Sequence, residues 1–345
     1  MTSVNQLPRY IRVSAGSAIV LGLMNAKLDA APTTAYLMTY RKQKCDANCS
    51  FCSQARDSNG KSDMLSRVTW PIFPTKTVIK QIGTTFRKHE IKRVCLQVLN
   101  YPEAIAHVIA LVQAIHSSTG MPISASCQPI SREQMVKMAK AGAQRIGIPL
   151  DAATEEIFDK IKGSAVGGPY RWETQMQLLR DACEVFGKGM VSTHLIVGIG
   201  ETEEQMIKSL QNCIDMGVLP GLFAFTPIPG TILSQRAPPD IQRYRRIQIV
   251  RYLMLNKMAR SDDMKFEENI LTRYGVSEKL VDDLVRTGEP FLTSGCPDCN
   301  RPYYNERPGD TFYNYPRNLK RIEIHEIEKQ LRNDRKRAKH GNELK

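Results

Sequence analysis

The stretch TTAYLMTYRKQKCDANCSFCSQAR, residues 33–56, decides the fold. It begins with an apolar run, Ala35–Tyr40, that is typical of a short buried strand. Three cysteines, Cys45, Cys49 and Cys52, follow with CxxxCxxC spacing. A loop after such a strand lies at the strand's carboxyl end, where parallel α/β proteins place their chemistry. The segment therefore predicts an α/β protein whose first strand leads into a cysteine-lined site.

Further apolar strands alternate with helical stretches along the chain, as in parallel βαβ units. We expect strands at Val94–Leu99, Ile123–Cys127, Arg145–Leu150, Val191–Val197 and Leu222–Thr226. The expected helices are Glu103–His116, Arg132–Ala141, Trp172–Phe186 and Glu203–Met216, with Ser131 and Thr202 as N-caps and Gly142, Gly187 and Gly217 near the C-caps. Six strand–helix units predict an open, partial (β/α)6 TIM-like barrel, although periodicity alone also fits a flat doubly wound sheet.

The chain divides into three regions. Residues 1–30 form an N-terminal segment, residues 31–260 the core barrel, and residues 261–345 a C-terminal extension laid over the barrel. The extension contains a predicted helix, Ser277–Arg286, the Gly/Pro/Tyr-rich segment GEPFLTSGCPDCNRPYYNERPGDTFYNYPR, and a charged helix from Asn318.

Charge and hydropathy limit the classes of partner and the cellular compartment that we expect. Lys and Arg number 48 against 35 Asp and Glu, a net charge of +13 that favours an acidic partner. The basic cluster Arg332, Arg335, Lys336, Arg337 and Lys339 favours a solvated helix slightly over a docking patch. No stretch approaches the roughly 20 apolar residues needed to span a bilayer, and the opening segment is a poor signal peptide. We therefore expect a cytoplasmic protein without membrane contact.

The nine cysteines point to metal binding or catalysis. Clustered cysteines in a reducing compartment rarely form disulfides, and an odd number cannot be fully paired. Three neighbouring thiolates can hold three irons of a cubane and leave the fourth iron open to an outside ligand. A zinc knuckle is the alternative, but structural zinc normally takes four protein ligands, and no fourth Cys or His lies near this loop.

The CxxxCxxC loop, with the aromatic Phe51 before its last cysteine, resembles the radical S-adenosylmethionine (SAM) superfamily. The resemblance implies a [4Fe–4S] cluster on Cys45, Cys49 and Cys52 whose open iron binds SAM. It places Phe51 at the cluster or the adenine, Asn100 of NYPE at the methionine end of SAM, and Asp151 among the ligand contacts. The strand LIVGIGE resembles a GxIxGxxE motif along the adenosine, which implies roles for Ile196, Gly198 and Glu201, although Leu195 replaces the first glycine. Helix capping by Asp151 and an ordinary glycine turn are the structural alternatives.

Within the superfamily, Thr33 to Pro229 is most similar to the biotin synthase and lipoyl synthase branch, on the strength of CSQAR, VCLQVLNYPE, SASCQPIS and HLIVGIGE. The resemblance implies a second, sulfur-donating iron–sulfur cluster on inward-facing strand cysteines. Cys95 and Cys127 occupy two such positions, and Ser192 occupies the next. With the CxxC pair Cys296 and Cys299 they make four thiolates, enough for an auxiliary cluster. A zinc site and inert buried cysteines are the alternatives. Cys183 and Cys213 are expected in the core, and so is His194, although its place on the fifth strand would also let it face the cavity.

The C-terminal segments TRYG, GEPFLTSGCPDCNRPYYNERPG and YNYPR resemble the archaeal-type, two-component lipoyl synthases. That resemblance implies sulfur insertion into the octanoyl chain of a lipoyl carrier domain through a 5′-deoxyadenosyl radical. It further implies a sister radical SAM subunit and an electron donor such as ferredoxin. The alternatives are a biotin synthase-like or other sulfur insertion, an RNA-modifying radical SAM enzyme, and a non-catalytic iron–sulfur scaffold. Nucleic acid is an unlikely partner because the sequence contains no recognisable RNA-binding module.

Overall fold

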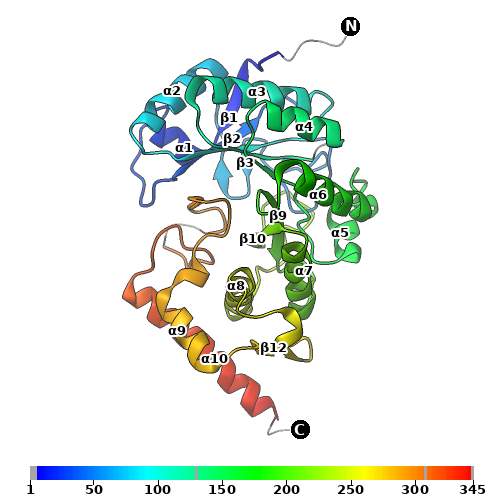
Figure 1. Cartoon of the computed structure of the whole chain (residues 1–345), viewed down its shortest axis with the longest axis vertical. Helices are drawn as coiled ribbons and strands as arrows, with labels where there is room; N and C mark the ends of the chain where they lie inside the picture. The colour runs from blue at the N-terminus through cyan, green and yellow to red at the C-terminus, as the bar shows by residue number, and fades with distance from the viewer. Residues whose placement is uncertain (1–5, 129–130, 307–308, 343–345) are drawn as a thin grey trace.

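The computed structural model describes residues 6–128, 131–306 and 309–342 (Figure 1). Its main sheet has eight strands in the order β10-β9-β8-β7-β6-β2-β1-β5. Six of them run parallel in sequence order: β2 (Thr34–Thr39), β6 (Arg93–Gln97), β7 (Ile123–Ser126), β8 (Arg145–Gly147), β9 (Val191–Val197) and β10 (Val218–Ala224). The six predicted strands are thereby confirmed, in an arrangement consistent with a partial TIM-like barrel.

Helices connect the parallel strands and cover the outer face of the sheet (Figure 1). They are α2 (Thr75–Arg87), α3 (Ala104–Thr119), α4 (Arg132–Lys140), α5 (Glu155–Lys162), α6 (Trp172–Phe186) and α7 (Glu203–Asp215), and α8 (Ile241–Leu255) follows the last parallel strand. On α3, Val108, Leu111, Val112 and Ile115 are all fully buried, at the spacing that keeps one helical face on the sheet. Ser131 and Thr202 are the N-caps of α4 and α7, as expected, and each also forms a capping box with the glutamine three residues on.

Several elements differ from the sequence-based prediction. Two short strands, β1 (Tyr10–Val13) and β5 (Ile72–Pro74), extend the sheet antiparallel beyond β2. The helices α2, α5 and α8 were not predicted, and neither was the short α1 (Ala15–Val20). Strand β8 ends at Gly147 rather than Leu150, and the chain rejoins β9 only through a single bridge between Asp151 and Leu195. Asp151 has a φ of +66°, a left-handed conformation that breaks strand geometry.

The C-terminal extension packs along α8 and then returns to the sheet. It comprises the hairpin β11 (Lys265–Glu267) and β12 (Ile270–Arg273), α9 (Glu278–Thr287) and α10 (Arg321–Asn342). Between α9 and α10 the chain reaches back toward the strands (Figure 1). The amide of Leu222 on β10 donates to Ser294 Oγ (2.7 Å), and Asn300 Nδ2 donates to the carbonyl of Ala31, just before β2 (2.8 Å). The segment 294–305 therefore links β10 to the start of β2.

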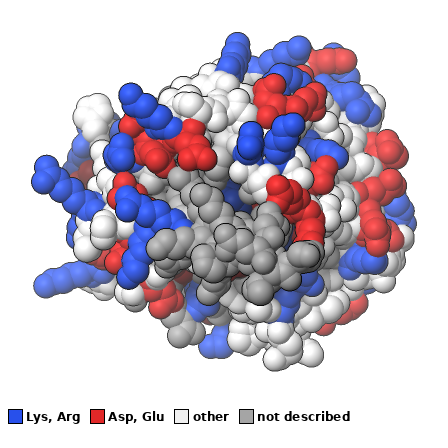
Figure 2. Space-filling view, turned by 90° about the horizontal axis from the view of Figure 1, so that it is seen from below, with Lys and Arg blue, Asp and Glu red and all other residues white. Residues whose placement is uncertain are grey.

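The charge is distributed rather than gathered on the face seen in Figure 2, where basic and acidic side chains alternate. Of the basic tail cluster, the side chains of residues 335–339 lie outside the described part of the chain. No helix among the described residues combines the length and hydropathy needed to cross a membrane.

Candidate cluster and cofactor site

The CxxxCxxC loop is held in place by its own backbone and by the neighbouring strand end. The amide of Cys45 donates to the carbonyl of Gln54 (2.9 Å), and the amide of Asp46 donates to the carbonyl of Asn100 (2.8 Å). Lys44 Nζ donates to the carbonyls of Ser53 (2.9 Å) and Gly60 (2.8 Å), which fastens the far side of the loop. The loop therefore presents its three thiols into one cavity of about 220 Å³ at the carboxyl end of the strands.

The three thiols are buried and electrostatically coupled. Burial raises the pKa of Cys52 to about 12 and raises the pKa of Cys45 and Cys49 as well. Lys162 opposes the shift at Cys49, and the amide of Asn100 donates to Cys45 Sγ (3.1 Å). Thiolates bind metals and thiols do not, so cluster loading must displace these protons. Three soft sulfur donors on one cavity wall fit an iron–sulfur cluster better than a hard-cation site.

No group of three or more His, Cys, Asp or Glu side chains in the described part of the chain has the spacing of a site for a bound metal ion. The assignment of the thiols therefore depends on the cavities that they line and on the chemistry of their donors.

A buried ion pair lies opposite the cluster loop. Lys162 Nζ donates to Asp151 Oδ2 (2.6 Å) and to the carbonyl of Pro149 (2.8 Å), and its side chain is only 1% exposed. The ammonium also lies over the rings of Phe158 and Tyr170, 5.4 and 5.1 Å from their centroids. Asp151, Lys162 and Tyr170 all line the cavity. Asp151 does not cap α5, because Thr154 does so through the amide of Ile157 (3.3 Å). The capping alternative for Asp151 is thus wrong.

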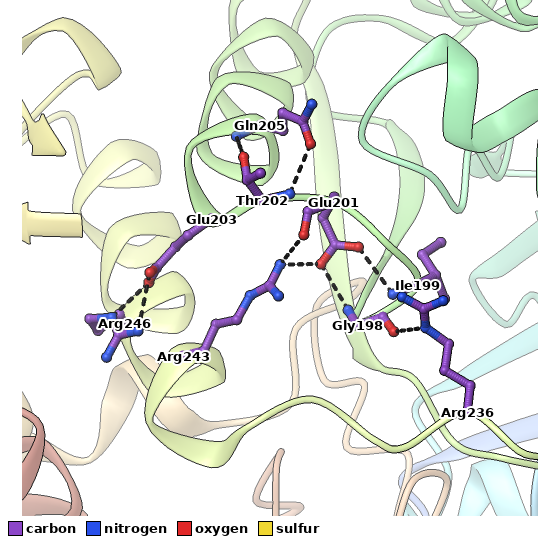
Figure 3. Close-up of polar contacts among 9 residues, drawn as sticks. All are labelled: Gly198, Ile199, Glu201, Thr202, Glu203, Gln205, Arg236, Arg243 and Arg246. Atoms are coloured by element: carbon purple, nitrogen blue, oxygen red, sulfur yellow. Dashed lines mark hydrogen bonds and ion pairs between the residues drawn. The ribbon is translucent and has the colours of Figure 1, made fainter. Parts of the chain in front are cut away.

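The turn after β9 is clamped from two sides (Figure 3). The carboxylate of Glu201 accepts from the amides of Gly198 (2.8 Å) and Ile199 (3.0 Å) and from Arg243 Nη2 of α8 (2.6 Å). Arg236 Nε donates to the carbonyl of Gly198 (2.7 Å). Gly198 has a φ of +101°, and a Cβ there would meet the Pro239 ring at 2.9 Å, so the turn requires glycine. Gly198 and Glu201 therefore shape the turn.

The residues predicted to bind the cofactor fall into two groups, those that line the cavity and those that do not. Phe51, Asn100, Asp151 and Ile196 line the cavity that holds the three cysteines, whereas Gly198 and Glu201 do not. The expectation that Glu201 itself contacts the cofactor has no support in this geometry, since three donors already occupy its carboxylate.

A second thiol set lies deeper in the barrel. Cys95 of β6 and the CxxC pair Cys296 and Cys299 line one small cavity together with Arg93 and Arg301. Burial raises the pKa of Cys95 to about 12, and Cys296 and Cys299 are among the charges that raise it further. The structure thus brings together three of the four cysteines expected for the auxiliary cluster.

Each sulfur of this set has a polar neighbour. Gln97 Nε2 donates to Cys95 Sγ (3.0 Å), Ser124 Oγ lies 3.3 Å from Cys296 Sγ, and Tyr36 Oη lies 3.3 Å from Cys299 Sγ. Ser124 Oγ already accepts from Arg93 Nη1, and Tyr36 Oη accepts from the amide of Arg301. Both hydroxyl hydrogens are therefore free to point at sulfur, an environment that suits thiolate ligands. The cavity is only about 40 Å³, so a four-iron cluster requires the CxxC loop to move outward.

Cys127 does not join this set, contrary to the prediction. It lines the larger cavity, is 2% exposed, and packs in the main hydrophobic core with Ala125. Successive residues of a strand point to opposite faces. Cys95 is in register with Ser124, so these two point to the same side and line the second cavity, whereas Cys127 lies past the end of β7, on the wall of the first cavity. Cys127 is therefore separated from the other three cysteines by its place along the barrel.

His194 was expected in the core, but it lies on the wall shared by the two cavities. Its ring packs edge-on against Phe223, with 4.9 Å between centroids, and burial lowers its pKa to about 4. Cys213 is buried in the core as predicted. Cys183 is partly buried and packs against the same core.

Sequence reasoning missed Tyr36, Ser124, Lys162 and Arg301. A usable signal existed for the first two, because Tyr36 and Ser124 are the register partners of Cys95 on either side. None existed for Arg301, which reaches the barrel from a loop far along the chain.

Comparison with known proteins agrees with this geometry. The sequence model of the Radical SAM superfamily matches residues 41–213, half of the chain. Biotin synthases of Corynebacterium glutamicum are 26% identical over 222 residues, and one of Brachyspira hyodysenteriae is 23% identical over 227. These alignments span 62–64% of the relatives' own length and 63–65% of this chain.

Solved structures support the fold. Methylornithine synthase superposes with a TM-score of 0.50 at 20% identity, over 65% of this chain and 63% of that one. The FeFe-hydrogenase maturase HydG of Carboxydothermus hydrogenoformans gives 0.50 at 15% identity, over 65% and 52%. With three thiols on the loop after β2 and a matching family model over half its length, this chain belongs to the radical SAM superfamily, which uses a [4Fe–4S] cluster and SAM.

Proposed function

We propose that this chain is a radical SAM sulfur-insertion enzyme that acts on the octanoyl chain of a lipoyl carrier domain, together with a sister subunit. The observation that carries the proposal is the second thiol set, Cys95, Cys296 and Cys299, on a cavity beside the one that holds the first three cysteines. Ser126, His194 and Phe223 line both cavities, so a sulfur source in one lies next to a radical source in the other.

The two thiol sets have separate duties in this proposal. Cys45, Cys49 and Cys52 hold the cluster that binds SAM, and Cys95, Cys296 and Cys299 hold the auxiliary cluster. When bound, these groups supply a hydrogen-abstracting 5′-deoxyadenosyl radical and a sulfide. Cys127 lines the cavity of the first set and not that of the second, so the proposal does not count it among the ligands of the auxiliary cluster.

The chain's own residues position the reactants and exclude water. The clamp on the β9–α7 turn fixes Ile196 beside the cavity, and the Asp151–Lys162 pair supplies a buried anion and a buried cation for the polar groups of SAM. Aromatic side chains, Phe51, Tyr170, Phe223 and Tyr304, line the same space. Such a wall keeps solvent away from a radical that would react with almost any nearby C–H bond.

The choice of an octanoyl substrate follows the C-terminal segment. Its CxxC pair lies outside residues 41–213, the part matched by the superfamily as a whole, and the segment resembles two-component lipoyl synthases. A positive net charge of +13 also suits the docking of an acidic carrier domain and a small acidic electron donor such as ferredoxin. Relatives named biotin synthase support a second candidate, sulfur insertion into dethiobiotin.

One assay separates these functions. Anaerobically reconstituted, reduced protein is given SAM with octanoyl-lysyl peptide, dethiobiotin or RNA in parallel, with and without the candidate sister subunit. We expect 5′-deoxyadenosine together with a sulfur-containing octanoyl product by mass spectrometry. Product from dethiobiotin alone would replace the proposal with the second candidate, and 5′-deoxyadenosine without any C–S bond would refute sulfur insertion.

A further inference from the structure

A third cavity, of about 380 Å³, lies between the N-terminal segment, the β3–β4 hairpin (Met64–Leu65 and Val68–Thr69) and the C-terminal loop. It is larger than the cavity of the first cysteine set and falls within the range of roughly 300–1,000 Å³ usual for small-molecule sites. No residue expected from the sequence to bind cluster or cofactor lines it.

The lining of this cavity is mainly apolar. Apolar side chains come from all three surrounding segments: Leu28, Ala30, Pro32, Val68, Trp70 and Pro302. Its charged residues are Arg67, Arg301 and Glu306, and the last two have partners within the protein. Glu306 accepts from the amides of Tyr313 (2.7 Å) and Asn314 (3.2 Å), and Arg301 lies over the rings of Tyr36, Phe223 and Tyr304 at 4.8–5.6 Å. An uncharged hydrocarbon suits such a wall better than an ionic ligand.

The third cavity shares walls with both thiol sites. Gln97 and Tyr304 line it and the cavity of the first cysteine set, and Arg301 lines it and the cavity of the second set. Gln97 Nε2 also donates to Cys95 Sγ (3.0 Å), so the inner end of the third cavity lies one side chain from a sulfur of the second set. A substrate carbon that must meet the radical first and sulfur next has to reach this junction.

We propose that the third cavity is the acyl channel, which takes a straight saturated chain inward until its reacting methylene lies at Gln97 and Tyr304. The inference rests on the proposed function and adds the route of the substrate. The wall is fastened beside the N-terminal segment, because Tyr303 Oη donates to the carboxylate of Asp29, between Leu28 and Ala30.

Trp70 lines the cavity, so its fluorescence can report whether the acyl chain enters. The chain has two tryptophans, and Trp172→Phe leaves Trp70 as the single reporter on the cavity wall. The probe is an 8-bromooctanoyl-lysyl peptide added to the cluster-loaded variant, because bromine quenches indole emission only at close range. We expect at least about a twofold loss of Trp70 emission relative to the bromine-free octanoyl peptide. Binding of the brominated peptide without that loss would overturn the channel and would leave the cavity to another ligand, such as a small sulfur donor.

Narrowing the channel gives an independent measurement. Ala30→Phe, or Leu28→Phe if the first variant folds poorly, should raise KM for the octanoyl peptide about tenfold and change kcat much less. The matched control is Ala139→Phe, at a half-buried alanine on α4 outside the described cavities. A wild-type KM in both narrowing variants overturns the channel while sulfur insertion stands. Quenching of Trp70 without any C–S product retains the channel and rejects the proposed function.

Discussion

The two thiol sites differ in how the chain builds them. The first takes Cys45, Cys49 and Cys52 from a single loop within eight residues, fastened by backbone hydrogen bonds. The second combines Cys95 on a central strand with Cys296 and Cys299 from the extension, and each sulfur has its own side-chain neighbour. A local site is specified by spacing, whereas an assembled site depends on the register of strands and on the docking of a distant segment. The two sites should therefore respond differently to mutation.

The largest effect should come from the first site. Replacing Cys45, Cys49 and Cys52 together with alanine should abolish SAM cleavage, because the cluster loses all its protein ligands. If the sites are independent, about four irons per chain should remain on the second set, as measured by iron and sulfide analysis with Mössbauer spectroscopy. Loss of all iron would show that the second site does not hold a cluster by itself. Cys183→Ala, in α6, is the control.

The second site should govern product rather than cleavage. Cys296→Ala with Cys299→Ala should leave 5′-deoxyadenosine formation and reduce sulfur-containing product by at least about a hundredfold. Both quantities can be measured in one reaction by mass spectrometry. If sulfur insertion were unchanged in this variant, the second site would not be the source of the sulfur.

The buried ion pair beside the first site should matter for stability. Lys162→Met leaves Asp151 buried without its cation, so the free energy of unfolding should fall by about 3–5 kcal/mol. Lys160→Met, two residues earlier, breaks an exposed pair with Glu156 and should cost less than about 1 kcal/mol. Denaturant titration of both variants checks the difference. Adding Asp151→Asn to Lys162→Met should restore part of the loss; a further fall would contradict an electrostatic origin.

Cys127 tests whether the second thiol set excludes the cysteine that lines the first cavity. Cys127→Ala should lower stability by about 1–2 kcal/mol through lost core packing and leave iron content unchanged. Cys95→Ala should instead remove iron from the second site. Iron loss in the Cys127 variant would place its thiol back among the ligands.

The smallest effect concerns His194. The charges that act on its ring are those of Arg301, Asp151 and Lys162. Its folded pKa of about 4 lies below the usual 6.5, so the unfolded chain binds a proton that the folded chain refuses. Stability is therefore complete above pH 6.5 and declines as pH falls toward 4, by under about 1 kcal/mol between pH 7 and 6. Denaturation at these two pH values should show a flatter profile in His194→Gln. The control variant is His325→Gln, at an exposed histidine of α10.

The sequence sufficed for the parts of the molecule that depend on local patterns. Six strands, the N-caps Ser131 and Thr202 and the loop of Cys45 were predictable because periodicity and spacing act over a few residues. The second site was not, since the sequence does not give the register that pairs Cys95 with Ser124 and leaves Cys127 past the end of β7. The roles of Glu201 and Lys162 depend on partners from other elements, Arg243 and Asp151, that no motif links to them.

The segment 294–305, which links β10 to the start of β2, determines the order in which the two thiol sites form. Ribosomal synthesis completes the six parallel strands before Ser294 and Asn300 emerge, so the first iron–sulfur loop is available for maturation early. Until the segment 294–305 docks on β10 and β2, Cys95 faces an open interior that metal carriers can enter. The segment 294–305, made after all six parallel strands, thus brings two of the three thiols of the second set and closes the interior around Cys95.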